Sequence, residues 1–404
     1  MPASKHLRTS LLVIGAALSS KDVCVAQHVP DTSSRFTYTE TNISPEKARE
    51  LSRAHTSLTL SRLESLPADV AAALAEPRHG KENEMMELTL SAVREISADA
   101  AGGLARHSGR IRLPAVEKLS VDAAAALFGE RGKAIELDGL LDVSPEVARA
   151  MAGCRRPALT IGINALTTDI AAILANFRGH LFFPNLQSLS VDSAKALQAH
   201  GGPHYWLIFG KTFITPQVAE TLLGHEGGLA FSVDRLEPGV GDILARHESS
   251  VDVTLVEIDS VALARKMFRE DGASSSLHRL RTMSPEIAAE YVRWQPGYLS
   301  SLDTLSVEAA KELAKDTHDI NLPAITKLSP ELALALTDRK PAVYLGGLKS
   351  LDGPDAVAVA EALASTPAPV YIEHLERVSA PALAALQKKA TIKIPPDEKL
   401  TIVP

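Results

Sequence analysis

Hydrophobic residues recur along the chain in one pattern that combines two periods. Four copies show it most clearly, at residues 111–127, 135–151, 181–197 and 320–336. Each copy begins with Leu-x-Leu or a close variant. A serine follows several residues later, then a proline or valine, then an acidic residue, and then alanine and leucine at helical spacing. The first part alternates as a β-strand does, and the second has the spacing of an amphipathic helix. Each copy therefore predicts a short strand, a turn and a helix.

Weaker copies extend the pattern almost from end to end. They begin near residues 36, 58, 88, 159, 205, 229, 251, 275, 297, 343 and 370, which makes about fifteen copies of about 24 residues. A unit this short cannot bury its own apolar face, whereas a stack of units can. Because strands pack about 4.8 Å apart and helices are about 10 Å wide, such a stack curves. We expect an α/β right-handed solenoid, with a parallel sheet on the concave face and helices on the convex face.

The start of each predicted helix carries local signals that agree with this register. A serine precedes the helix, where its hydroxyl can accept from an unpaired amide, and a proline often follows it. Alanine recurs on the helix where neighbouring helices would touch. The serines are Ser120, Ser144, Ser190, Ser306 and Ser329, the prolines Pro145, Pro285 and Pro330, and the alanines Ala124, Ala148, Ala194 and Ala310.

The repeat resembles that of the leucine-rich-repeat superfamily, whose unit carries L-x-L-x-x-N-x-L. The copy with Leu159, Ile161, Asn164 and Leu166 fits it in full, and the copy from Leu229 fits with Asp234 for Asn. The resemblance covers about residues 36–390 and is similar to divergent secreted bacterial repeat proteins. It implies a solenoid and a binding role, and it brings no catalytic residue. Most copies have an aliphatic residue in the Asn slot, so we expect packing to hold their turns: Leu140, Leu186, Leu302 and Ile325.

The first residues read as a secretory signal peptide, residues 1–26. Lys5 and Arg8 precede an apolar stretch at 11–18, which is too short to cross a bilayer. Cleavage after Ala26 or after Ser19 both fit the small residues present. We therefore expect a secreted or periplasmic protein with no membrane span in the mature chain.

The remaining chain divides into three predicted parts. Residues 27–57 form an N-terminal cap with the first repeat, residues 58–390 the solenoid, and residues 391–404 a C-terminal cap. The charged stretch 78–84 and the Gly- and Ser-rich stretch 270–276 are predicted to be mobile loops.

Composition narrows the classes of partner. The net charge is −7 with acids and bases interspersed, so no basic surface favours nucleic acid. Cleavage after Ala26 would leave Cys154 as the one cysteine, and a packed thiol is the simpler interpretation of it.

No motif for a metal, a phosphate or a nucleophile stands in the sequence, so we expect no cofactor, no metal site and no enzyme. Histidines follow several predicted helices, where a cationic ring would complement the helix dipole. These histidines are His55, His107, His200, His204, His225 and His247.

The predicted binding surface is the concave strand face. Tyr344, Tyr371 and His374 are expected to be neighbours there. On the same register Leu137 points inward and Glu136 outward, so Leu137→Asp should unfold neighbouring units and Glu136→Lys should leave stability nearly unchanged. The candidate binding residues are Glu136, Asp138, Phe182, Asn185, Asp252, His278, Asn321, Tyr344, Tyr371, Glu373 and His374.

The leading hypothesis is a secreted or periplasmic scaffold, expected to be a monomer, that binds a protein or a glycan through this face. The alternative is a structural or adhesive envelope component that self-associates. A third hypothesis, a hydrolase with its chemistry on an insertion, has no motif to support it.

Overall fold

The computed structural model describes residues 35–76, 87–269, 277–295 and 297–404. They belong to two compact units. The first unit runs to residue 232 and includes 246–251, and the second comprises 233–245 and 252–404. The expected signal peptide at 1–26 and the expected loops at 78–84 and 270–276 fall outside the described residues.

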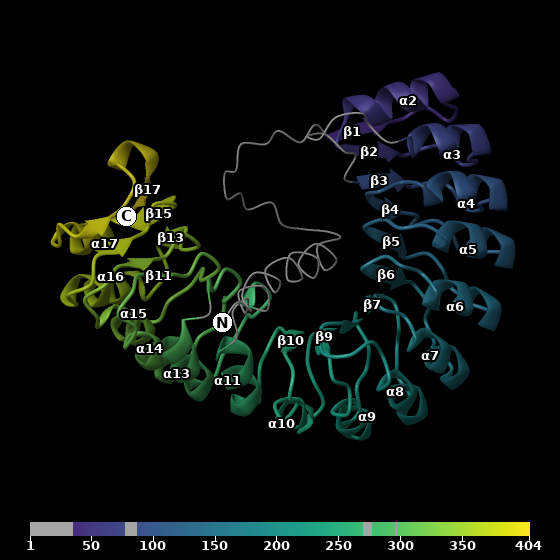
Figure 1. Cartoon of the computed structure of the whole chain (residues 1–404). Helices are drawn as coiled ribbons and strands as arrows, with labels where there is room; N and C mark the ends of the chain where they lie inside the picture. Colours follow the sequence, from purple (N-terminus) through teal and green to yellow (C-terminus); the bar gives the residue numbers. More distant parts are fainter. Residues whose placement is uncertain (1–34, 77–86, 270–276, 296) are drawn as a thin grey trace, which may run out of the picture. The chain divides into compact units, whose positions relative to one another are not determined.

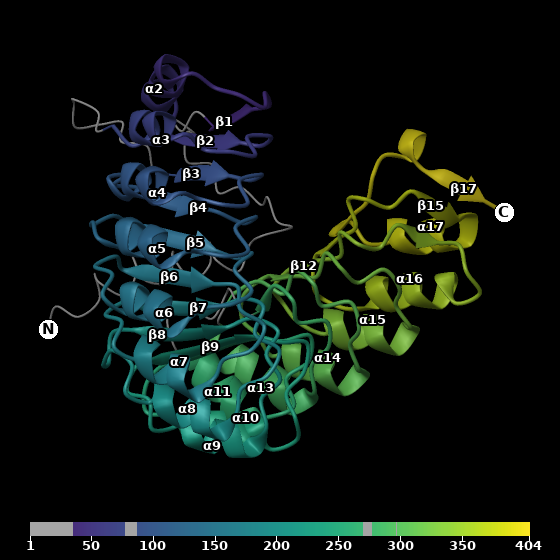
Figure 2. The ribbon, with the colours of Figure 1, turned by 90° about the vertical axis from the view of Figure 1, so that its right-hand side faces the viewer.

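In the first unit, strands and helices alternate along the chain, with the strands on one side and the helices on the other (Figure 1). Figure 2 shows its strands stacked in a row beside the helices. The main sheet orders ten strands from β1 to β10 as they occur in the sequence; β1 to β9 lie in the first unit, and all of β10 except its first residue belongs to the second. The strands are β1 (Arg35–Tyr38), β2 (Ser57–Leu60), β3 (Glu87–Leu90), β4 (Arg110–Arg112), β5 (Ala134–Leu137), β6 (Ala158–Ile161), β7 (His180–Phe183), β8 (Trp206–Phe209), β9 (Gly228–Ser232) and β10 (Val251–Thr254). The helices of this unit are α2 (Pro45–Ala54), α3 (Ala68–Leu74), α4 (Ala98–Ala105), α5 (Val121–Phe128), α6 (Pro145–Ala152), α7 (Thr168–Leu174), α8 (Val191–Leu197) and α9 (Pro216–Leu222).

The second unit continues the alternation with shorter strands in two parallel sheets. One sheet has the order β11-β12-β14-β16 and the other β13-β15-β17. The strands are β11 (Ile320–Asn321), β12 (Val343–Tyr344), β13 (Ser350–Leu351), β14 (Val370–Tyr371), β15 (Arg377–Ser379), β16 (Ile392–Lys393) and β17 (Thr401–Val403). The helices are α10 (Val240–Leu244), α11 (Val261–Arg269), α13 (Pro285–Trp294), α14 (Val307–Leu313), α15 (Pro330–Thr337), α16 (Ala356–Ser365) and α17 (Ala380–Gln387), with a 3₁₀ turn η1 (Asp397–Lys399).

The repeat pattern accounts for the core, and the predicted strand–turn–helix solenoid with a parallel sheet is confirmed. Ile135 and Leu137 point inward and are fully buried, and Ile135 pairs in register with Leu159 of the next repeat. At the helix starts, all five predicted serines accept a hydrogen bond from the amide three residues on. The four helix alanines are also fully buried.

Two copies of the repeat depart from the prediction. The copies near residues 275 and 297 predict strands, but the described residues between β10 and β11 form none. Leu277 and Leu302 of these copies are nevertheless fully buried. The leucine pattern thus predicts burial correctly here, while the backbone pairing is reduced to an isolated parallel bridge between Glu257 and Thr282.

The turns after the strands are held by packing in most repeats. Leu140 and Leu186 are fully buried in the slot where the family unit carries Asn. Asn164, expected to match that unit in full, is exposed, and Ile163 is buried instead. The asparagine that ties repeats together is Asn185, whose Nδ2 donates to the backbone oxygens of Asp138 at 2.8 Å and Gly162 at 3.2 Å.

Beyond the helix ends of the first unit, three histidines from successive repeats stack on one another. Ring centroids lie 5.6 Å apart for His200 and His225 and 6.5 Å apart for His225 and His247. Burial, and secondarily the neighbouring ring, lowers the pKa of His200 to about 3 and that of His225 to about 4. The expectation of cationic rings on the helix dipole is therefore wrong for these two, because burial keeps them neutral. His204 is exposed and outside the stack.

Buried arginines satisfy helix-end carbonyl groups in other repeats. Arg156 is 1% exposed, and its guanidinium donates to the carbonyl oxygens of Ala105 at 2.9 Å, His107 at 3.3 Å and Gly109 at 3.4 Å. Nearby Cys154 is buried, and burial raises the pKa of its thiol, which confirms the packed interpretation.

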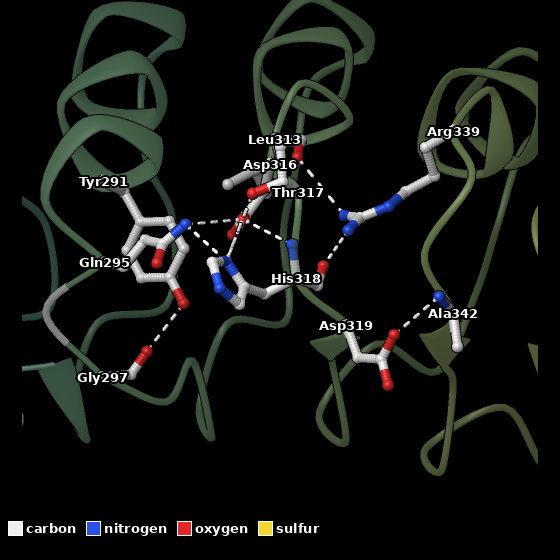
Figure 3. Close-up of polar contacts among 10 residues, drawn as sticks. All are labelled: Tyr291, Gln295, Gly297, Leu313, Asp316, Thr317, His318, Asp319, Arg339 and Ala342. Atoms are coloured by element: carbon white, nitrogen blue, oxygen red, sulfur yellow. Dashed lines mark hydrogen bonds and ion pairs between the residues drawn. The ribbon is translucent and has the colours of Figure 1, made fainter.

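In the second unit an arginine likewise donates to carbonyl oxygens at the end of α14 (Figure 3). Arg339 donates to the backbone oxygens of Leu313 and His318. Beside it, the buried carboxylate of Asp316 accepts from the Gln295 side chain at 2.9 Å and from the His318 amide at 2.9 Å. This network closes the turns that follow α13 and α14, so we assign it a structural role.

Candidate functional site

A hollow of about 120 Å³ opens on the strand face of the first unit, the side of the sheet that points away from the helices. Consecutive strands β4 to β7 build it, because Arg112, Glu136, Thr160 and Phe182 are neighbours in the parallel register. We call it the strand-face hollow, and its lining residues are Arg112, Glu136, Asp138, Thr160, Phe182, Pro184 and Asn185. The structure thus brings four of the candidate residues together: Glu136, Asp138, Phe182 and Asn185.

The two arginines of β4 hold Glu136 in this hollow. Its Oε2 lies 2.6 Å from Arg112 Nε and its Oε1 lies 3.3 Å from Arg110 Nη1. Arg112 also reaches Glu87 of β3 at 3.4 Å. Sequence reasoning missed Glu87 and Arg110, although they are paired across β3 and β4 and begin those strands.

Glu136 was expected to be exposed, and that expectation is wrong. It is 7% exposed, because an outward side chain in the middle of the sheet lies between those of the neighbouring strands. Burial raises the pKa of its carboxyl group more than Arg112 and Arg110 lower it. An outward-pointing position is therefore not a solvated one in these repeats.

Asp138 is the acid of the hollow that has no salt bridge within the described part of the chain. It follows β5 and is half-buried, and burial raises the pKa of its carboxyl group against the opposing effect of Arg112. Asn185, which is exposed, uses its Nδ2 for the two backbone oxygens described above. Its side-chain oxygen therefore remains available as an acceptor at the same rim.

An apolar cluster continues the strand face beyond the hollow. Phe182, Trp206, Ile208 and Ala230, from β7, β8 and β9, are each less than 10% exposed. Trp206 alternates along β8 with the fully buried Leu207 and Phe209, so it points to the strand face with Ile208. Phe182 belongs both to this cluster and to the hollow, which gives the hollow one apolar wall.

The second unit carries a separate pair of stacked tyrosines on its own strand face. Tyr344 of β12 and Tyr371 of β14 have ring centroids 4.5 Å apart and planes 12° apart. The register continues this row to Asn321 on one side and Lys393 on the other. The pKa of Tyr344 is raised by desolvation and then by the nearby acids, Asp319 first.

The other candidate residues are spread along the second unit. Glu373 and His374 are exposed in the loop after β14. Asp252 is buried in β10, and His278 is half-buried. Asp252 and His278 are not part of the tyrosine row by register, so the predicted surface is a series of separate patches.

The described residues also bear on metal binding and on membrane insertion. No group of three or more His, Cys, Asp or Glu side chains there is arranged to hold a metal ion. Among the helices described, none combines the length and the apolar character needed to cross a bilayer.

The solved structures to which this chain is similar include leucine-rich-repeat proteins, at low sequence identity. An internalin from Listeria monocytogenes is 11% identical with a TM-score of 0.35, over 87% of this chain and 88% of that one. TLR13 in its complex with ssRNA13 is 14% identical with a TM-score of 0.42, over 81% and 54%. Toll in the Toll–Spatzle complex of Drosophila is 10% identical with a TM-score of 0.41, over 87% and 48%.

This chain thus spans about half the length of the TLR13 and Toll chains. No family model matches the sequence, and no curated protein matches it. With TM-scores below 0.5, the similarity goes no further than the repeat architecture that the strands and helices themselves display.

Proposed function

We propose that this protein is a repeat scaffold that binds a protein partner through its strand faces. The observation that carries the proposal is the strand-face hollow, which combines a half-buried acid, an amide acceptor and an aromatic wall on a regular sheet. Such a mixture of anchored polar groups and aromatic surface is typical of protein interfaces.

The size of the hollow favours a partner protein over a small-molecule ligand. Its volume is about 120 Å³, whereas pockets for small molecules usually measure about 300–1,000 Å³. A hollow of this size accepts one side chain of a partner, while the surrounding sheet supplies the rest of an interface.

We further propose that the protein acts outside the cytoplasm, as a secreted or periplasmic protein. The basic, apolar and small-residue segments at the N-terminus support this location. Mass spectrometry of the chain recovered from culture fluid or periplasm is expected to find Gln27 or Ser20 as the first residue. A chain that keeps its first residues and stays in the cytoplasm would contradict the proposed location.

A capture experiment with variants of the two strand faces tests the binding role. The full chain is immobilised and exposed to cell-envelope and culture-fluid proteins of its source. We expect at least one protein to be retained and then lost, by tenfold or more, on Asp138→Lys or on the double variant Tyr344→Ala and Tyr371→Ala. Purified candidates are then measured by calorimetry against the same variants.

The matched control is Glu361→Lys in α16, since Glu361 is an exposed helix residue with no salt bridge within the described residues. It makes the same change of charge away from the strand faces. Equal retention by wild type and all variants would contradict binding through the strand faces. If the immobilised chain retains only further copies of itself, the result would favour the self-associating envelope component instead.

A further inference from the structure

We propose that the strand-face hollow binds a basic side chain, a lysine or arginine, of the partner protein. This inference rests on the proposed binding function and adds the chemistry of the contact. Three features of the hollow carry it: its balance of charge, its acceptors and its apolar wall.

The balance of charge leaves one acid without a partner. Three lining residues are charged, the acids Glu136 and Asp138 and the base Arg112, and the ion pairs add Glu87 and Arg110 around them, so the group carries one negative charge in excess. Both arginines are already engaged by Glu87 and Glu136. An anion would meet occupied cations here, whereas a cation meets the unpaired carboxylate of Asp138.

The acceptors belong to two residues that both line the hollow, Asp138 and Asn185. Asn185 Nδ2 donates to the backbone oxygen of Asp138 at 2.8 Å, which holds the amide beside the Asp138 residue. The bond to the Gly162 oxygen at 3.2 Å fixes its orientation further. With its donors used, Asn185 presents its oxygen, so the rim offers a carboxylate and a carbonyl oxygen to an incoming N–H group.

The apolar wall suits the stem of a basic side chain. Phe182 and Pro184 are the apolar residues that line the hollow. Phe182 also belongs to the apolar cluster with Trp206 and Ile208. Lysine and arginine place their methylene stems along apolar surface while the charged end stays with polar groups. A phenyl ring such as that of Phe182 can also attract a cation placed over its face.

A library of random twelve-residue peptides on phage, selected on the immobilised full chain, tests this inference. Selected peptides are expected to share one Lys or Arg. Replacing it by its uncharged analogue, norleucine or citrulline, should weaken binding at least tenfold. The protein variant Asp138→Asn should cause a similar loss, and the two changes together should cost little more than either alone, because they remove the same contact.

The variant Glu361→Gln is the control and should bind the peptides as the wild type does. Circular dichroism checks that Asp138→Asn is folded, and Asn185→Ala provides a second variant of the same rim. Peptides that bind through the strand face without a basic residue, or that ignore Asp138→Asn and Asn185→Ala, would overturn the basic contact and leave the scaffold function standing. Selection of no peptide at all would count against both proposals.

Discussion

Replacing Leu137 by Asp is expected to unfold the repeats around β5. Leu137 is fully buried, so an aspartate there would place a charge inside the apolar core. Burial of an unpaired charge is among the few changes that cost about 4 kcal/mol or more. In a solenoid each repeat depends on its neighbours, so the loss should extend to β4 and β6. Thermal melting by circular dichroism and hydrogen exchange of β4 to β6 measure it.

Glu136→Lys provides the matched comparison on the opposite side of the same strand. Glu136 is buried between Arg110 and Arg112, so a lysine at this position would place three positive charges next to one another. We expect a smaller loss than for Leu137→Asp, about 2 kcal/mol, since both arginines are partly exposed. Glu136→Gln, which introduces no cation, should lose less. Wild-type melting of Leu137→Asp would contradict the register, and wild-type melting of Glu136→Lys would contradict the ion-paired position of Glu136.

Acidification is expected to destabilise the first unit through its buried histidines. The pKa values of His200, His225 and His107 are lowered to about 3, 4 and 4, mainly by burial. An unfolded histidine has a pKa of about 6.5, so below that pH the unfolded chain takes up protons that the folded chain does not. Stability is therefore complete above pH 6.5 and falls as the pH drops toward 4, by about 1.4 kcal/mol per pH unit for each ring.

Denaturant unfolding at pH 7, 6 and 5 measures this dependence. The double variant His200→Phe and His225→Phe keeps two aromatic rings in the stack without titration, so its stability should fall less steeply with pH. Proton NMR of the wild type supplies a second readout, in which the ring signals of His200 and His225 should not titrate between pH 8 and 5. An unfolding midpoint that stays constant from pH 7 to 5, or titration of these rings near pH 6.5, would contradict the prediction.

The candidate site shows where prediction from sequence stops. The strand register placed Glu136, Asp138 and Phe182 on the outward face, and the structure places all three at one hollow. The degree of burial was not predictable in the same way. An outward side chain is covered by residues about 24 positions away on either side, and their lengths and charges decide whether it meets water. Glu136 is buried for this reason, while Thr59 at the outward position of β2 is half-exposed.

The sequence by itself determined the repeat, its strand–turn–helix order, the helix caps and the inward-facing core, because these depend on local periodicity and on short-range hydrogen bonds. The tertiary structure decided which outward residues meet. It set the ion pairs around Glu136, the exposure of Asn164, the neutral histidine stack and the tyrosine pair. The physical reason is that these contacts join side chains of successive repeats, where spacing and dielectric environment arise only when the repeats are stacked.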